Sequence, residues 1–144
     1  ILRPMPEDTL FDTGSDELLK SVYARQGRTL DDLPYTPQFE AIYAAMGGDE
    51  AGFTRQQLFH RLHNLRKAGH LPRMGRAVEG PPRIDTKHEQ LLTQLVEQQV
   101  ERLSLRDRLP YTDAFDQIVT AFNTQAGLSL SPHDVWRIIA KLAK

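Results

Sequence analysis

The sequence predicts an all-α protein made of two tandem three-helix modules related by an internal repeat. The tetrapeptide Leu-Pro-Tyr-Thr occurs at residues 33–36 and again at residues 109–112, and further identities follow at the same offset. Such a repeat resets the expected domain count. Apolar residues recur at helical spacing along the chain, and no segment alternates apolar and polar residues as a half-buried strand would. We therefore expect helices throughout, three in each module.

The repeat and the distribution of Pro and Gly divide the chain into four parts. The predicted boundaries are an N-terminal tail at 1–14, a first module at 15–73, a linker at 74–84 and a second module at 85–144. Pro and Gly cluster around the linker, and both residues favour turns over regular structure. Each module has about 60–70 residues, which is near the lower limit for an independent core.

Capping residues indicate where the helices of the first module begin. After a first helix at about 15–26, Thr36 is a suitable N-cap, and Pro37 suits the first helical position, where no N–H is needed. Thr54 caps a third helix at about 54–68. Within the repeated tetrapeptide we expect Pro to fix a turn, Thr to cap the following helix, and Leu and Tyr to fill the small core.

The second module is expected to contain helices at about 85–104, 113–124 and 132–143. The last of these is apolar over much of its circumference, with Val135, Trp136 and Ile139 among its residues. A helix that is apolar nearly all round favours burial. We expect this module to have shifted toward packing, either on the first module or on a partner.

Composition excludes several classes of protein. The 144 residues are 40% hydrophobic and 26% charged, with no cysteine. Disulfides and thiolate chemistry are therefore excluded, and a reducing compartment is allowed. No apolar run approaches the ~20 residues of a membrane span. We expect a cytoplasmic protein that has no contact with a membrane.

The net charge of −1 conceals a strong asymmetry along the chain. Residues 1–50 hold four basic and ten acidic residues, whereas residues 51–78 hold six basic residues and no acid. Residues 79–144 are nearly balanced, with eight basic and nine acidic residues. A basic block of this kind is a candidate footprint for nucleic acid. The alternative is a solvated basic face that pairs with the acidic N-terminal segment.

The third helix of the first module is the best candidate for a binding surface. Its apolar residues form one stripe, and polar or basic residues without any acid cover the other side. Gln, Asn and Arg can make paired hydrogen bonds to the edges of adenine or guanine, and further basic residues can hold phosphates. The predicted DNA-binding residues are Arg55, Gln56, Gln57, His60, Arg61, His63, Asn64, Lys67, Arg73 and Arg76.

Residues 65–73, Leu-Arg-Lys-Ala-Gly-His-Leu-Pro-Arg, resemble the end of a recognition helix in many bacterial regulators. The chain resembles trihelical DNA-binding modules of the helix-turn-helix kind over roughly residues 37–73. The resemblance implies that the helix at 54–68 enters a groove of double-stranded DNA. One departure is the segment between the second and third helices, about 47–53, which is longer than the usual turn of three or four residues.

We therefore expect a DNA-binding protein, a regulator or an accessory factor, and not an enzyme. No phosphate-cradling glycine loop and no nucleophile–base pair can be recognised, so no catalytic residue and no cofactor is predicted. His60 and His63 lie one turn apart, but the ligand set of a metal site is missing around them. The alternative function is a protein-interaction or homodimerisation module that uses the helices at 85–104 and 132–143.

Overall fold

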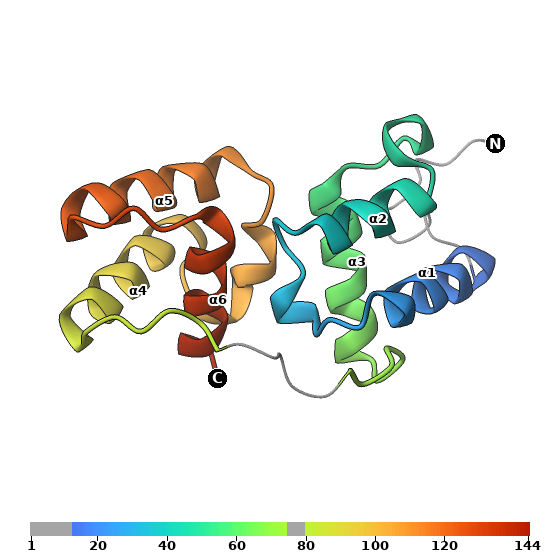
Figure 1. Cartoon of the computed structure of the whole chain (residues 1–144), viewed down its shortest axis with the longest axis horizontal. Coiled ribbons are helices and arrows are strands. Elements are labelled where there is room, and N and C mark those ends of the chain that lie inside the picture. The colour runs from blue at the N-terminus through green and yellow to red at the C-terminus, as the bar shows by residue number, and fades with distance from the viewer. Residues whose placement is uncertain (1–12, 75–79) are drawn as a thin grey trace. The chain divides into compact units, whose positions relative to one another are not determined.

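The computed structural model describes residues 13–74 and 80–144, and in these ranges the chain is all-α with no strand (Figure 1). The fold-class prediction is therefore confirmed. The chain divides into two compact units, Ile1–Arg76 and Ala77–Lys144, and this division falls within the segment expected to be a linker. Most of the predicted tail, and the predicted DNA-binding residue Arg76, lie outside the described residues.

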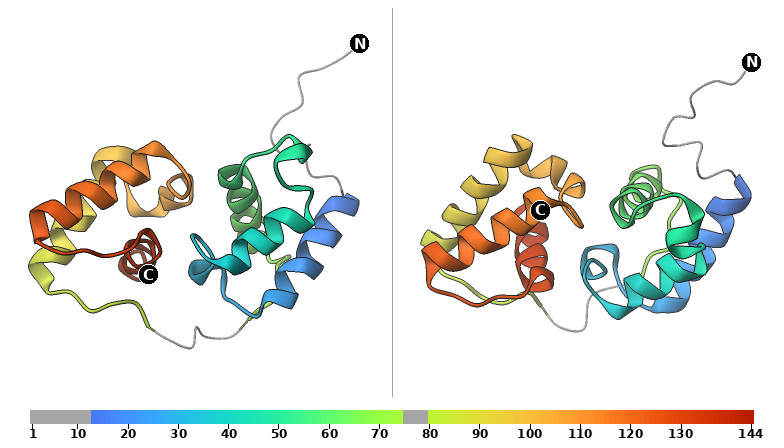
Figure 2. Two further views of the ribbon diagram at one scale, coloured as in Figure 1. Left: turned by 45° about the horizontal axis from the view of Figure 1, so that its top comes forward. Right: turned by 90° about the horizontal axis from the view of Figure 1, so that it is seen from above.

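Within residues 13–74, the first unit has three α-helices and two short 3-10 helices. They are α1 (Thr13–Gln26), η2 (Leu30–Asp32), α2 (Pro37–Ala45), η3 (Gly48–Ala51) and α3 (Arg55–Lys67). α1 and α2 lie side by side, and α3 runs across them (Figures 1 and 2). Leu19 of α1, Phe39 of α2 and Leu62 of α3 are fully buried. The rings of Phe39 and Phe59 lie 6.4 Å apart and join α2 to α3.

Within residues 80–144, the second unit has three α-helices and one 3-10 helix. They are α4 (Thr86–Val100), η4 (Leu103–Arg108), α5 (Asp113–Ala126) and α6 (Pro132–Leu142). α4 and α5 pair along their lengths, and α6 crosses them (Figure 1). The ring of Trp136 lies 6.4 Å from that of Phe115, edge to face. Trp136 is completely buried, and α6 packs on α4, α5 and η4 of its own unit. The expected packing on the first module or on a partner stays a prediction.

Both copies of the repeated tetrapeptide form the same capped turn. In each copy the Thr hydroxyl donates to the carbonyl of the tetrapeptide's own Leu at 2.6 Å. The same oxygen accepts from the backbone N–H three residues further on, at 3.2 Å. Thr36 thus caps α2 and Thr112 caps α5, as the sequence predicted. The repeat as a relation between the whole modules remains a prediction.

The tyrosine of the tetrapeptide has a different role from the one expected. Leu33 and Leu109 are buried, but Tyr35 and Tyr111 are only partly buried. The φ angles of the two tyrosines are 65° and 66°, in the left-handed region that costs an L-residue about 1–2 kcal/mol. The leucine therefore fills the core, and the tyrosine occupies the bend where the chain must turn sharply into the next helix.

The first helix of the second unit is shorter than predicted. It ends at Val100 rather than near 104, because Glu101 adopts a φ of 71° and a ψ of −42°. The N–H of Arg102 donates to the carbonyl of Val100 at 2.8 Å, which closes a γ-turn around Glu101. Neither Gly nor Pro marks this turn in the sequence, so the usual breaker residues gave no sign of it.

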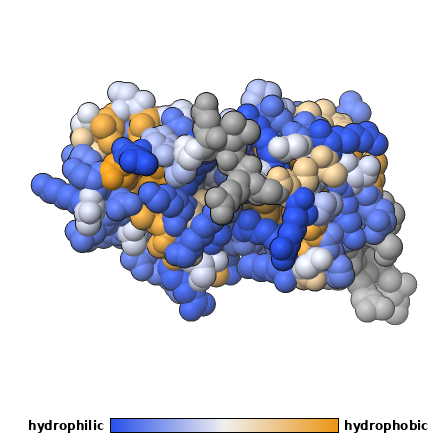
Figure 3. Space-filling view, turned by 60° about the horizontal axis from the view of Figure 1, so that its bottom comes forward, coloured by the Kyte–Doolittle hydropathy of each residue, from blue (hydrophilic) through white to orange (hydrophobic). Residues whose placement is uncertain are grey.

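The surface is mostly hydrophilic, with small apolar areas, on the face shown in Figure 3. Leu18 is the large apolar side chain that is exposed in the described part of the chain, at 47%. None of the described helices combines the length and the apolar character needed to cross a membrane.

Candidate nucleic-acid interface

Capping hydrogen bonds fix both ends of α3. At the start, the Thr54 hydroxyl accepts from the N–H of Gln57 at 3.1 Å, and the Gln57 side-chain oxygen accepts from the N–H of Thr54 at 2.8 Å. This reciprocal pair is a capping box. Gln57 was predicted to contact DNA, but its side-chain oxygen is already engaged in holding the helix start.

At the other end, Gly69 adopts a φ of 76°, which glycine tolerates without a steric cost. Its N–H donates to Arg66 O at 3.0 Å, and the N–H of His70 donates to Leu65 O at 2.9 Å. This pair of bonds is a Schellman motif. It ends α3 directly after Lys67 and sets the direction in which the chain continues toward Arg73.

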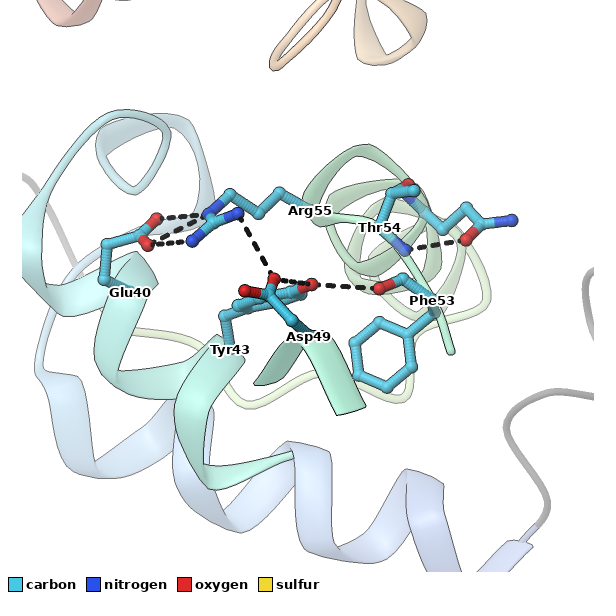
Figure 4. Close-up of polar contacts among 7 residues, drawn as sticks. Glu40, Tyr43, Asp49, Phe53, Thr54 and Arg55 are labelled. Atoms are coloured by element: carbon cyan, nitrogen blue, oxygen red, sulfur yellow. Dashed lines mark hydrogen bonds and ion pairs between the residues drawn. The ribbon is translucent and has the colours of Figure 1, made fainter. Parts of the chain in front are cut away.

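Arg55 lies between two carboxylates and over an aromatic ring (Figure 4). Its Nε is 2.9 and 3.0 Å from the two oxygens of Glu40, and its Nη1 is 3.8 Å from Asp49 Oδ1. The guanidinium carbon lies 4.4 Å from the centroid of the Tyr43 ring. Arg55 was predicted to contact DNA, but its charge is balanced within the unit by residues of α2 and η3.

The same cluster orders the long connection between α2 and α3. The Tyr43 hydroxyl lies 3.0 Å from Asp49 Oδ1 and 3.0 Å from Phe53 O. Burial raises the pKa of Tyr43, and the carboxylate of Asp49 raises it further. The hydroxyl therefore keeps its single hydrogen, which it can donate to either acceptor or share between them. The connection between α2 and α3 therefore contains a short 3-10 helix held by side chains.

Arg61 pairs with Asp16, which lies 45 residues earlier in α1. Nε of Arg61 donates to Asp16 Oδ1 at 3.0 Å, and Nη2 contacts the second oxygen. The two side chains are 18% and 15% exposed. This two-point contact ties α3 to α1, and the predicted DNA contact of Arg61 stays a prediction.

A third arginine of α3 contacts the η2 segment. Nη1 of Arg66 lies 3.3 Å from Asp31 Oδ1, and Nη2 lies 3.0 Å from Nε2 of His63. A guanidinium is only a donor, so Nε2 must be the acceptor and the His63 ring is neutral. His63 is 3% exposed and lies against the Phe59 ring. The prediction that His63 belongs to the outer face is therefore wrong.

These pairs explain the charge asymmetry of the sequence. Four acids of the N-terminal segment lie against arginines of the acid-free segment, namely Asp16, Asp31, Glu40 and Asp49. The roles of Asp16, Asp31 and Glu40 could not be found from spacing within α3. The available signal was the complementary charge of the two segments, since an excess of acid precedes a block with none.

The outer face of α3 remains open between the arginine pairs. Gln56, His60 and Asn64 are spaced four residues apart, and Lys67 follows on the same face. The first three are partly exposed and Lys67 is exposed. Nδ2 of Asn64 lies 3.2 Å from Nε2 of His60. These four members of the predicted site are brought together by the structure, and no acid lies among them on the helix.

Two further predicted cations follow this face along the chain. Arg73 is exposed beyond the end of α3, and Arg76 falls outside the described residues. Neither Lys67 nor Arg73 forms an ion pair with a residue in 13–74 or 80–144. Positive charge that is not balanced in the described part of the first unit therefore gathers at the C-terminal end of α3.

The two helices predicted to contact a protein partner, α4 and α6, bury apolar side chains. In α6 the apolar side chains Val135, Trp136 and Ile139 are fully buried, and α4 buries Leu92 and Val96.

The described residues contain no group of three or more metal-ligating side chains. Comparisons of the chain with protein-family models, with curated proteins and with solved structures found no significant match.

Proposed function

We propose that the first unit binds double-stranded DNA through the outer face of α3. The observation that carries the proposal is a helix face of amide, imidazole and ammonium groups (Gln56, His60, Asn64 and Lys67) that is partly exposed or exposed and has no acid of α3 on it. A single α-helix fits the major groove of B-DNA, which is about 12 Å wide. Amide side chains at this position can hydrogen-bond to the edges of bases.

The arginines of α3 take a supporting part in this proposal. Arg55, Arg61 and Arg66 tie α3 to α2, α1 and η2, and so hold the open face in one orientation. A base-reading surface on a rigid element loses less conformational entropy on binding than one on a mobile element. Phosphate contacts then fall to Lys67, Arg73 and Arg76, which lie at or beyond the end of the helix.

The alternative function, a protein-interaction module using α4 and α6, has less support. A docking helix needs an apolar face open to its partner. The main apolar side chains of α6 are buried in the chain, and Leu18 of α1 is the large apolar side chain exposed among the described residues.

The proposal predicts a specific dependence of DNA affinity on salt. Each phosphate contact contributes about −0.9 to the slope of log affinity against log salt concentration. Three cations that each contact one phosphate therefore predict a slope of about −2.7. The double substitution Lys67→Ala and Arg73→Ala should reduce the slope to about −0.9. Fluorescence anisotropy of a labelled duplex between about 50 and 200 mM salt measures it.

The matched control replaces two exposed lysines of the second unit, Lys87→Ala with Lys141→Ala. It removes the same charge, and its slope should equal that of the unsubstituted chain. An equal loss of slope in both double variants would show that binding follows net charge rather than the α3 face. No binding at about 50 mM salt with micromolar protein would contradict DNA binding altogether.

A further inference from the structure

We propose that Asn64 recognises an adenine base and that His60 is the positioning residue that orients its carboxamide. The inference rests on the proposed DNA binding and names the residue of α3 that gives it sequence preference. It follows from one contact on the open face of the helix, the 3.2 Å approach of Asn64 Nδ2 to His60 Nε2.

The donor and acceptor in this contact are fixed by chemistry. The amide nitrogen of Asn64 is a donor only, so Nε2 of His60 must accept, and the neutral ring then carries its proton on Nδ1. One of the two amide hydrogens is used in this way. The second hydrogen and Oδ1 remain available, because no other described residue hydrogen-bonds to the Asn64 side chain.

The remaining pair of groups, one donor beside one acceptor, matches adenine in the major groove. Adenine presents the N6 amino donor and the N7 acceptor, whereas guanine presents two acceptors, O6 and N7. Against guanine the outward Oδ1 of Asn64 would face another acceptor. Rotating the carboxamide by half a turn would only place Oδ1 against the other guanine acceptor, and it would also break the hydrogen bond to His60.

The other amides of α3 are less suited to this role. The oxygen of Gln57 accepts from the backbone of Thr54 in the capping box. Gln56 lies two turns before Asn64 on the same face, and no described contact holds its carboxamide in one orientation. Asn64 is therefore the amide with both an open donor–acceptor pair and a neighbour that fixes it.

The test is selection of duplexes from a random library by the full chain, followed by affinity measurements on the selected sequence. We expect one selected position to be adenine, and replacing that A·T pair by G·C to weaken binding roughly tenfold to a hundredfold. Asn64→Ala should abolish this preference and leave the slope against salt unchanged. His60→Ala should weaken binding to the selected duplex more than binding to its G·C variant, and so reduce the preference.

Two further variants separate positioning from a structural effect. His60→Gln keeps a side-chain acceptor one turn from Asn64, so it should restore part of the adenine preference. Gln98→Ala, at an exposed position of α4, should change nothing. An adenine preference that survives Asn64→Ala, or a uniform loss of affinity for all duplexes in His60→Ala, overturns the inference alone. Failure to bind any duplex overturns the inference together with the proposed function.

Discussion

Arg55, Arg61 and Arg66 carry half of the six positive charges of residues 51–78, yet each lies against a carboxylate from an earlier element. The pairs differ in burial, and burial decides how much each pair contributes to the stability of the first unit. Arg61 and Asp16 are largely buried, whereas Arg55 and Glu40 are 39% and 47% exposed. Water screens an exposed pair, but a buried carboxylate that loses its partner keeps most of its desolvation cost.

Arg61→Ala should therefore destabilise the first unit more than Arg55→Ala does. We expect a loss of about 2 kcal/mol in the free energy of unfolding for Arg61→Ala, since its hydrogen bonds to a charged group are largely buried. The loss for Arg55→Ala should stay below about 1 kcal/mol. Urea unfolding of both variants measures the difference. If Arg61→Ala were as stable as the unsubstituted chain, Arg61 would not stabilise the fold and would again be a candidate DNA contact.

Tyr23 predicts how the first unit responds to alkaline pH. Burial raises the pKa of Tyr23 to about 12 from its ordinary value of 10.0, and nearby Asp31 raises it while Arg66 lowers it. Because the folded pKa is the higher one, the stabilisation is complete below pH 10 and is lost as the pH rises toward 12. The loss should reach roughly 2–3 kcal/mol.

Urea unfolding of the full chain at a series of pH values measures this loss. Tyr23→Phe removes the ionisable group, so its stability should fall less steeply between pH 10 and 12. The same steep fall in both proteins would show that another group is responsible.

At the scale of the elements, the two tetrapeptide turns make a matched pair of strained positions. Tyr35→Gly should give a more stable protein than Tyr35→Ala, by about 1 kcal/mol, because alanine keeps the Cβ that a positive φ disfavours. The same order should hold at Tyr111, whose φ is nearly identical. Thermal unfolding of the four variants measures it. Alanine at least as stable as glycine at both positions would show that the bend carries no strain.

Local chemistry explains which elements could be predicted from the sequence. Thr36, Thr54 and Thr112 were expected to cap helices, and each does so through its own side chain. A cap involves residues only three positions apart, so its pattern is visible in the chain. The end of α4 was not predicted, because the γ-turn at Glu101 has no glycine to announce it.

The candidate site was predicted less completely than the fold, for a physical reason. Helical spacing placed Gln56, His60, Asn64 and Lys67 on one face, where the structure has them. The same spacing placed His63 there, but this side chain is 3% exposed and lies against the Phe59 ring. The partner of Arg61 is 45 residues away, and only the packing of α1 against α3 determines that contact.

At the scale of the whole molecule, the charge asymmetry of the sequence corresponds to ion pairs formed within the first unit. Acids from α1, η2 and α2 balance the arginines of α3, so half of the six basic residues in 51–78 stabilise the fold. Lys67, Arg73 and Arg76 remain for a polyanion. We therefore expect weak to moderate affinity for DNA with a shallow dependence on salt, rather than the steep dependence of proteins that make six to ten phosphate contacts.

The central claim, that the outer face of α3 contacts DNA, is tested most directly by NMR titration of the isotope-labelled full chain with a duplex. We predict that the side-chain amide signals of Gln56 and Asn64 and the backbone signals around Lys67 shift or broaden, and that added salt reverses the change. Signals of α4, α5 and α6 should stay in place. Shifts confined to the second unit, or none at protein concentrations of about 100 μM, would contradict the account.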